Sequence, residues 1–226
     1  MAEAFRRDPS FERRIVGRLD DVERAVVVDL MHQTSVLLSD GSDDAPDAPR
    51  GTDEDELFAA LGRSMSAREA PRDPALRRLL PDGVKDDDGA AAEFRRLTEA
   101  SLRDRKLRNL ATAMTAFERA GANVDLAQTM SAGEPRDVVL DEAEARATMM
   151  ALTDVRLVLA ERLGVRTDAD ADALVEQVER GQVPSDEEQL MAAYYDFLTW
   201  LAESVTLAVM REACGAAQRP STMETS

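Results

Sequence analysis

Two short stretches, "LDDVE" at Leu19–Glu23 and "LDEAE" at Leu140–Glu144, share one pattern and decide the fold. In each, a leucine comes directly before an aspartate, a glutamate stands three residues after the aspartate, and a long amphipathic segment follows. This spacing is typical of the capping box, in which both side chains bond to backbone amides at a helix start. We therefore expect two strands, around 13–19 and 138–140, that pair and set two long helices side by side. Coincident capping chemistry without strand pairing is the alternative.

The rest of the chain predicts further helices. Hydrophobic residues make up 44% of the sequence but aromatic residues only 4%, so a core must consist mainly of Leu, Val, Ala and Met. Leu, Ala and Met are strong helix formers. Apolar residues at helical spacing predict helices over 90–120 and 185–215, and capping residues predict shorter helices over 53–61, capped by Thr52 or Asp53, and over 168–180, capped by Thr167. The predicted fold is mostly α, a helical bundle with one short two-stranded β pairing.

The domain organisation follows from length and local composition. A chain of 226 residues fits one large or two small domains, and the sustained helical pattern favours one. Asp, Ser, Gly and Pro dominate 39–52, which is typical of a solvated or disordered loop. We expect a flexible N-terminus at 1–10, a single helical domain at 11–215 with a disordered loop at 39–52, and a flexible tail at 216–226.

The chain is strongly acidic. Its 28 Lys and Arg residues against 45 Asp and Glu residues give a formal net charge of −17. This charge repels a phosphate backbone and disfavours direct nucleic-acid binding, so the expected partner is a protein. The first residues lack the apolar run of a signal peptide, and Glu203 interrupts the most apolar late segment. We expect a cytoplasmic protein with no membrane association.

The sequence contains few residues that could perform catalysis or bind a cofactor. His32 is the single histidine and Cys214 the single cysteine, which removes most nucleophile–base pairs and Cys/His metal sites. The acidic runs lack the EF-hand pattern, and the chain has no Gly-rich phosphate loop. We expect no catalytic, cofactor-binding or metal site. Cys214 is a weak candidate redox thiol, with an inert thiol as the alternative interpretation.

The segment "DPALRRLLPD", Asp73–Asp82, is apolar in acidic surroundings. Asp73 is suited to cap a short helix that begins at Pro74 and stops at Pro81. Its three leucines then fit one helical turn packed onto the core. We expect a docked turn that ties the chain back after the loop, with partner binding as a secondary alternative.

Several blocks along the chain, taken in their sequence order, resemble an actinobacterial family known as domain of unknown function 2017, whose members are described as AosR-type oxidative stress regulators. They cover most of the chain from about Leu19 to Met210, and the strongest is the segment that begins at Asp73. The blocks are "LDDVERAVVVDLMHQ", "DPALRRLLPDG", "AAEFRRLTEASLRDRKLRNL", "LTDVRLVLAERLGV" and "YYDFLTWLAESV".

The resemblance implies a non-enzymatic cytoplasmic regulator that acts through protein contact, with a sigma factor as the partner, in the response to oxidants. The family's redox chemistry involves a cysteine pair, whereas this sequence has Cys214 alone. An intramolecular thiol switch is thus excluded within this sequence, which leaves partner binding or an intermolecular disulfide. The alternatives are an adaptor unrelated to transcription, for example in proteolysis, and an enzyme with clustered carboxylates and a divalent cation.

The blocks supply candidate structural or partner-contact residues, and the arginines among them could pair with acidic helices. The oligomeric state stays open between a monomer and a dimer. The candidates are Arg77, Arg78, Pro81, Arg95, Arg96, Lys106, Asp154, Arg156, Tyr194 and Trp200.

Overall fold

The computed structural model of the chain describes residues 2–8, 14–40, 71–81, 83, 87–122, 136–181 and 185–217. Its contacts divide the chain into two compact units. Unit 1 comprises Met1–Met31, Asn109–Thr153 and Ala193–Ser226, and unit 2 comprises His32–Arg108 and Asp154–Ala192. The single domain predicted over 11–215 stays a prediction.

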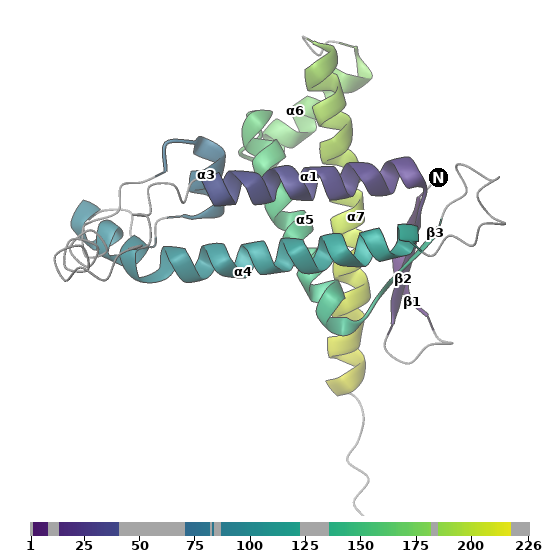
Figure 1. Cartoon of the computed structure of the whole chain (residues 1–226). Helices are drawn as coiled ribbons and strands as arrows, with labels where there is room; N and C mark the ends of the chain where they lie inside the picture. The colour runs from purple at the N-terminus through teal and green to yellow at the C-terminus, as the bar shows by residue number, and fades with distance from the viewer. Residues whose placement is uncertain are drawn as a thin grey trace, which may run out of the picture. The chain divides into compact units, whose positions relative to one another are not determined.

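Helices dominate the described residues, as predicted, and a small sheet accompanies them (Figure 1). The strands are β1 (Glu3–Arg7), β2 (Ile15–Leu19) and β3 (Arg136–Leu140). The helices are α1 (Asp21–Asp40), α3 (Pro74–Leu79), α4 (Asp88–Ala122), α5 (Glu142–Arg162), α6 (Asp168–Glu179) and α7 (Asp186–Ala217). Along the part of the chain that the structure describes, no helix is long and apolar enough to cross a membrane.

The predicted strand pairing is confirmed. β2 and β3 pair antiparallel in a continuous register that runs from Ile15 opposite Leu140 to Leu19 opposite Arg136. Both turns that follow these strands are capping boxes. In the first, the Glu23 amide donates to Asp20 Oδ1 at 2.8 Å, and the Asp20 amide donates to Glu23 Oε2 at 2.9 Å.

The second turn repeats this geometry at Asp141 and Glu144, with the two corresponding distances at 2.8 and 2.9 Å. Reciprocal capping satisfies amides that have no partner inside the helix. Each box therefore fixes the point at which a strand ends and a long helix begins.

The N-terminus differs from its prediction, because the first ten residues contain strand β1 rather than only flexible chain. β1 pairs antiparallel with β2 at the edge of the sheet, in the order β1-β2-β3. Phe5 is buried, and its ring lies 6.3 Å from that of Phe117, centroid to centroid. A Cβ atom at Gly17 would lie 2.8 Å from the Phe5 ring, so the glycine makes room for it. This aromatic contact holds the N-terminal strand in place.

The core of unit 1 is apolar. One face of the sheet contributes Phe5, Ile15, Leu19, Val138 and Leu140, all of which are buried. The helices of the same unit add buried side chains from α1, α4, α5 and α7, which are Val27, Leu30, Met31, Leu110, Phe117, Leu152, Leu198, Leu201 and Val205.

Unit 2 contains buried leucines and valines but also buried charge. Leu38, Leu76, Leu79, Val155 and Leu159 are its larger buried apolar residues. Three charged residues of the same unit are also at most 5% exposed, and these are Glu99, Arg103 and Asp154.

Several predicted segments fall at or beyond the ends of the described ranges. The loop predicted from residue 39 begins inside α1, which continues to Asp40, and its remainder lies outside the described residues, as does the predicted helix at 53–61. α7 continues to Ala217, into the predicted tail, of which the remainder also lies outside them.

Candidate functional site

The segment that begins at Asp73 is a helical turn packed into unit 2. α3 buries Ala75, Leu76 and Leu79, and the Ala75 amide donates to Asp73 Oδ1 at 2.7 Å. Partial burial alone raises the pKa of Asp73, but hydrogen bonds from Arg162 and the Ala75 amide outweigh it and lower the pKa. The docked turn predicted from the sequence is confirmed in this geometry.

Two charged contacts attach α3 to the end of α5. Arg162 Nη2 lies 2.6 Å from Asp73 Oδ2. Arg78 Nη1 lies 3.3 Å from Glu161 Oε2 and donates to the Val165 carbonyl at 2.8 Å. Arg78 therefore binds within the chain, which gives it a structural role.

The charged residues of α4 form a second structural cluster in unit 2. Arg103 Nη2 lies 2.8 Å from Glu99 Oε1, and Arg103 also donates to the Leu38 carbonyl near the end of α1. Lys106 Nζ lies 2.5 Å from Asp154 Oδ1. Burial raises the pKa of Asp154 and outweighs the opposite effect of Lys106.

These pairs lie inside the fold. The side chains of Arg103 and Glu99 are 6% and 4% exposed. Those of Lys106 and Asp154 are 16% and 6% exposed. A buried charge is tolerated only when a partner and further hydrogen bonds compensate its lost hydration. The pair Lys106–Asp154 is therefore a structural ion pair, which accounts for two of the candidates chosen from sequence.

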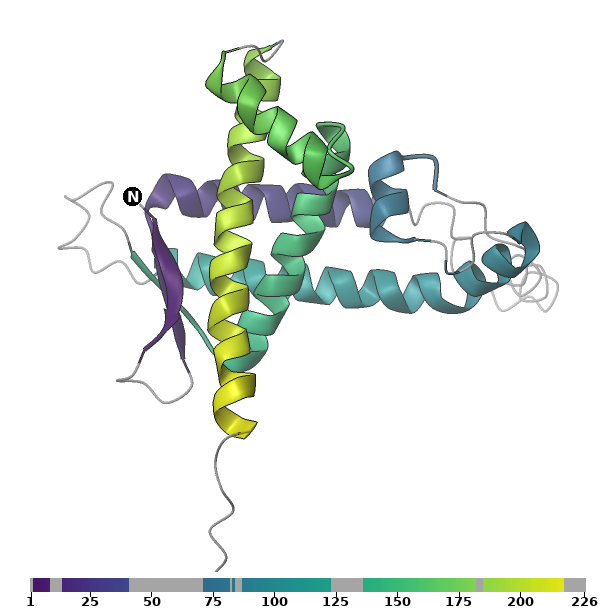
Figure 2. The ribbon, with the colours of Figure 1, turned by 180° about the vertical axis from the view of Figure 1, so that it is seen from behind.

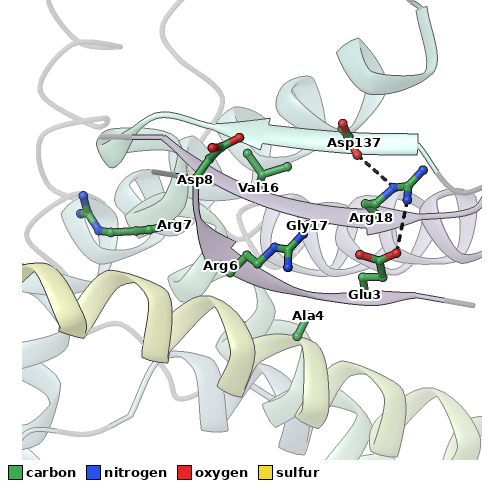
Figure 3. Close-up of a pocket in the computed structure, with 9 residues that line it drawn as sticks. All are labelled: Glu3, Ala4, Arg6, Arg7, Asp8, Val16, Gly17, Arg18 and Asp137. Carbon is green, nitrogen blue, oxygen red and sulfur yellow. Dashed lines mark hydrogen bonds and ion pairs between the residues drawn. The ribbon is translucent and has the colours of Figure 1, made fainter. Parts of the chain in front are cut away.

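A hollow of about 380 Å³ lies on the sheet in unit 1 (Figure 3). Arg18 crosses it, at 3.3 Å from Glu3 and 3.1 Å from Asp137. The three arginines in the lining face three carboxylates, so the charges balance and favour neither anions nor cations. The lining residues are Glu3, Ala4, Arg6, Arg7, Asp8, Val16, Gly17, Arg18 and Asp137.

The most distinctive surface feature of unit 1 is an exposed apolar face on α7. Trp200, Leu207 and Met210 are 37%, 57% and 61% exposed. They lie seven and three residues apart, a spacing that places all three on one side of a helix. Figure 2 shows the yellow part of α7 in the foreground, with no other element of unit 1 drawn over it.

The aromatic residue on this face is supported from within the helix. The rings of Phe197 and Trp200 stack, with centroids 6.2 Å apart and planes inclined by 24°. Such a contact restricts the indole, and rigid exposed aromatic residues are typical anchors of protein interfaces. We define the α7 face as Asp196, Trp200, Glu203, Leu207 and Met210, all of which are exposed.

The structure places the other candidate residues as follows. Arg77 on α3 and Pro81 just after that helix are exposed, whereas Arg156 on α5 and Tyr194 on α7 are half-buried. Arg95, Arg96 and Cys214 lie within the helical spans of α4 and α7, but their side chains are outside the described residues.

Four residues of these clusters were not among the candidates chosen from the sequence, and these are Glu99, Arg103, Leu207 and Met210. Glu99 and Arg103 stand four residues apart on α4, the spacing of a helical ion pair, and this signal could have found them. Leu207 and Met210 could have been found from their spacing to Trp200. Among the side chains that the structure describes, no three His, Cys, Asp or Glu residues come together as metal ligands.

Comparisons with known proteins give the family of this chain. Residues 2–209 match the family model of a domain of unknown function, DUF2017. A protein of Mycobacterium leprae named "Putative oxidative stress regulator AosR" is 32% identical over 156 residues, which cover 69% of this chain and 67% of that protein. No solved structure matches the chain significantly. The chain thus belongs to the DUF2017 family.

Proposed function

We propose that the chain is a non-enzymatic regulatory protein that acts in the cytoplasm through protein–protein contact. The observation that carries this proposal is the α7 face, where a stacked tryptophan, a leucine and a methionine are exposed together. Exposed apolar side chains gathered on one face, with an aromatic anchor, are a mark of an interaction site.

The family relationship supports a role in the response to oxidants. The name of the Mycobacterium leprae relative describes an oxidative stress regulator, and that relative covers more than two thirds of this chain. We propose the same setting here, with a sigma factor as the class of partner. The net charge of −17 supports a regulator that acts on a transcription protein rather than on DNA directly.

Reciprocal co-purification tests this proposal. The tagged chain would be expressed in an actinobacterial host and isolated by mild crosslinking before and after peroxide exposure, with partners identified by mass spectrometry. A sigma factor recovered with the chain, and the chain recovered with that tagged sigma factor, is the expected result. Recovery of no transcription or stress-response protein in either direction would contradict the proposal.

A further inference from the structure

The α7 face has the geometry of a helix-packing seam. Its five residues follow one another at alternating steps of four and three along the helix. This heptad spacing aligns side chains in a stripe that a second helix can pack against. From Asp196 to Met210 the stripe is about 21 Å long at 1.5 Å per residue, enough for several turns of a partner helix.

The seam carries charge of one sign. Asp196 precedes Trp200 and Glu203 lies between Trp200 and Leu207 along the seam, and both acidic residues are exposed. From Asp186 to Met210 the helix contains five acidic residues and no Lys, Arg or His. A helix that packs here would therefore meet two carboxylates within the stripe, and positive charges would complement them.

This charge pattern argues against a second copy of the chain as the occupant. Two α7 faces packed together would bring Asp196 and Glu203 of both copies into one interface. Like charges without counter-charges oppose association, and burial would increase their cost. A basic partner would instead place positive charges beside Asp196 and Glu203, which favours association.

We propose that the α7 face is the docking site for a basic amphipathic helix of the partner protein. The inference rests on the proposed function and names the chemistry of the partner. The leucine-type side chains of the partner pack around Trp200 and Leu207, and its Lys or Arg side chains pair with Asp196 and Glu203. Trp200 is the central anchor, because its stacking on Phe197 limits the entropy lost on binding.

Fluorescence anisotropy with designed peptides tests the inference on the full chain. The probe is a labelled helical peptide of about 21 residues with leucine at the a and d positions and Lys or Arg elsewhere. A second peptide has Glu in place of every Lys and Arg, and a third keeps the basic residues but replaces each leucine by serine. We expect binding of the first peptide alone, weakened when salt rises from about 0.05 to about 0.5 M.

Variants of the chain show where the peptide binds. W200S/L207S should lower the affinity at least about tenfold, because it removes the anchor and its neighbour. D196N/E203Q should lower it about threefold to tenfold and reduce its salt dependence. L207S alone changes a side chain that is 57% exposed and keeps the test valid if the double variant does not fold.

Matched controls separate a specific site from general attraction to an acidic protein. V175S alters an exposed apolar residue on α6, and D172N/E179Q removes two exposed charges from the same helix. Each should change the affinity less than about twofold, as for surface positions outside an interface. Equal binding of the first peptide by W200S/L207S and by V175S would overturn the inference.

The proposed function and this inference can fail separately. If a sigma factor co-purifies equally with the wild type and with W200S/L207S, the docking site is wrong and the function stands. If no transcription protein co-purifies but the basic amphipathic peptide binds through Trp200 and Leu207, the docking chemistry stands and the function is wrong.

Discussion

The two units of the chain differ in the kind of side chain that they bury. Unit 1 buries an almost wholly apolar set, built on Phe5, Phe117 and the sheet, yet leaves Trp200 and Leu207 exposed on α7. Unit 2 buries Glu99, Arg103 and Asp154. These three charged side chains lie inside the fold, whereas Asp196 and Glu203 of the α7 face are exposed to solvent.

This difference separates residues that hold the fold from residues that we propose bind a partner. Charged side chains in the family blocks were chosen as candidate contact residues. However, the blocks "LRDRKLRNL" and "LTDVRLVLAERLGV" contain Lys106 and Asp154, which form an ion pair inside the fold. Apolar side chains at helical spacing suggest a core, but four of those on α7 are exposed, and these are Leu190, Trp200, Leu207 and Met210. In this chain, burial and not residue type indicates the role.

The largest effect is expected from the apolar core of unit 1. Phe117→Ala removes a fully buried ring next to Phe5 and should lower the free energy of unfolding by about 4 kcal/mol. Urea unfolding followed by circular dichroism measures the loss.

The same experiment tests the single domain predicted from the sequence. α1, α4, α5 and α7 each contribute residues to both units, so we expect one transition that shifts as a whole. Two transitions, with only one shifted by Phe117→Ala, would contradict a single cooperative domain.

The buried ion pair of unit 2 should come next. Lys106→Met leaves the Asp154 carboxylate, whose side chain is 6% exposed, without its ammonium partner and should cost about 3 kcal/mol near neutral pH. Because burial raises the pKa of Asp154, the loss should shrink as the pH falls and the carboxyl becomes protonated.

The double variant K106M/D154L is the matched control for this pair. Replacing both charges by apolar side chains of similar size is often neutral, so most of the lost stability should return. A loss in the double variant as large as in K106M would show that packing, and not the unpaired charge, causes it.

A smaller effect is expected where α3 meets α5. Arg78→Ala removes contacts to Glu161 and to the Val165 carbonyl and should cost about 1–2 kcal/mol. Its neighbour Arg77 is exposed, and Arg77→Ala should stay within about 0.5 kcal/mol of the wild type. Thermal melts of the two variants compare them directly, and equal losses would refute the contact geometry.

The smallest effect is expected at the second capping box. A hydrogen bond from Arg119 lowers the pKa of Glu144 below its ordinary 4.5, despite the opposite effect of partial burial. Because the folded-state pKa is the lower one, the ionised carboxylate stabilises the fold above the unfolded pKa, and this is lost as the pH falls through the folded pKa.

Glu144→Gln keeps a capping side chain but not its charge. Since Arg119 is half exposed, the loss should be under about 1 kcal/mol near neutral pH and should shrink as the pH falls through the lowered pKa of Glu144. Unfolding at a series of pH values checks it, with Glu118→Gln as an exposed charge control on α4. A pH-independent loss in E144Q would indicate altered packing instead.

The fold was largely predictable because local chemistry decides it. The capping boxes at Asp20 and Asp141 and the proline-bounded turn of α3 follow from residue types at fixed spacing. The strand β1 was not predictable in this way, since its place depends on Phe5 meeting Phe117 from more than a hundred residues away.

Which face of a helix is buried was harder to predict. On α1, Val22 is 72% exposed, whereas Val27 and Met31 are fully buried. On α4, Phe94 and Leu97 are 40% and 63% exposed, whereas Leu110 and Phe117 are fully buried. Long helices with apolar residues on several sides carry an ambiguous pattern, and tertiary packing decides between their faces. The same difficulty applies to the α7 face. The sequence does not show which of the neighbours Trp200 and Leu201 is buried, and in the structure Leu201 is buried and Trp200 is exposed.

Backbone hydrogen exchange of the full chain, with and without the basic amphipathic peptide, tests most directly whether the buried charges hold the fold while the α7 face binds. We expect the peptide to slow exchange in α7 around Asp196–Met210 and to leave exchange in α4 around Glu99–Lys106 unchanged. Protection centred on Glu99–Lys106, with α7 unaffected, would contradict it.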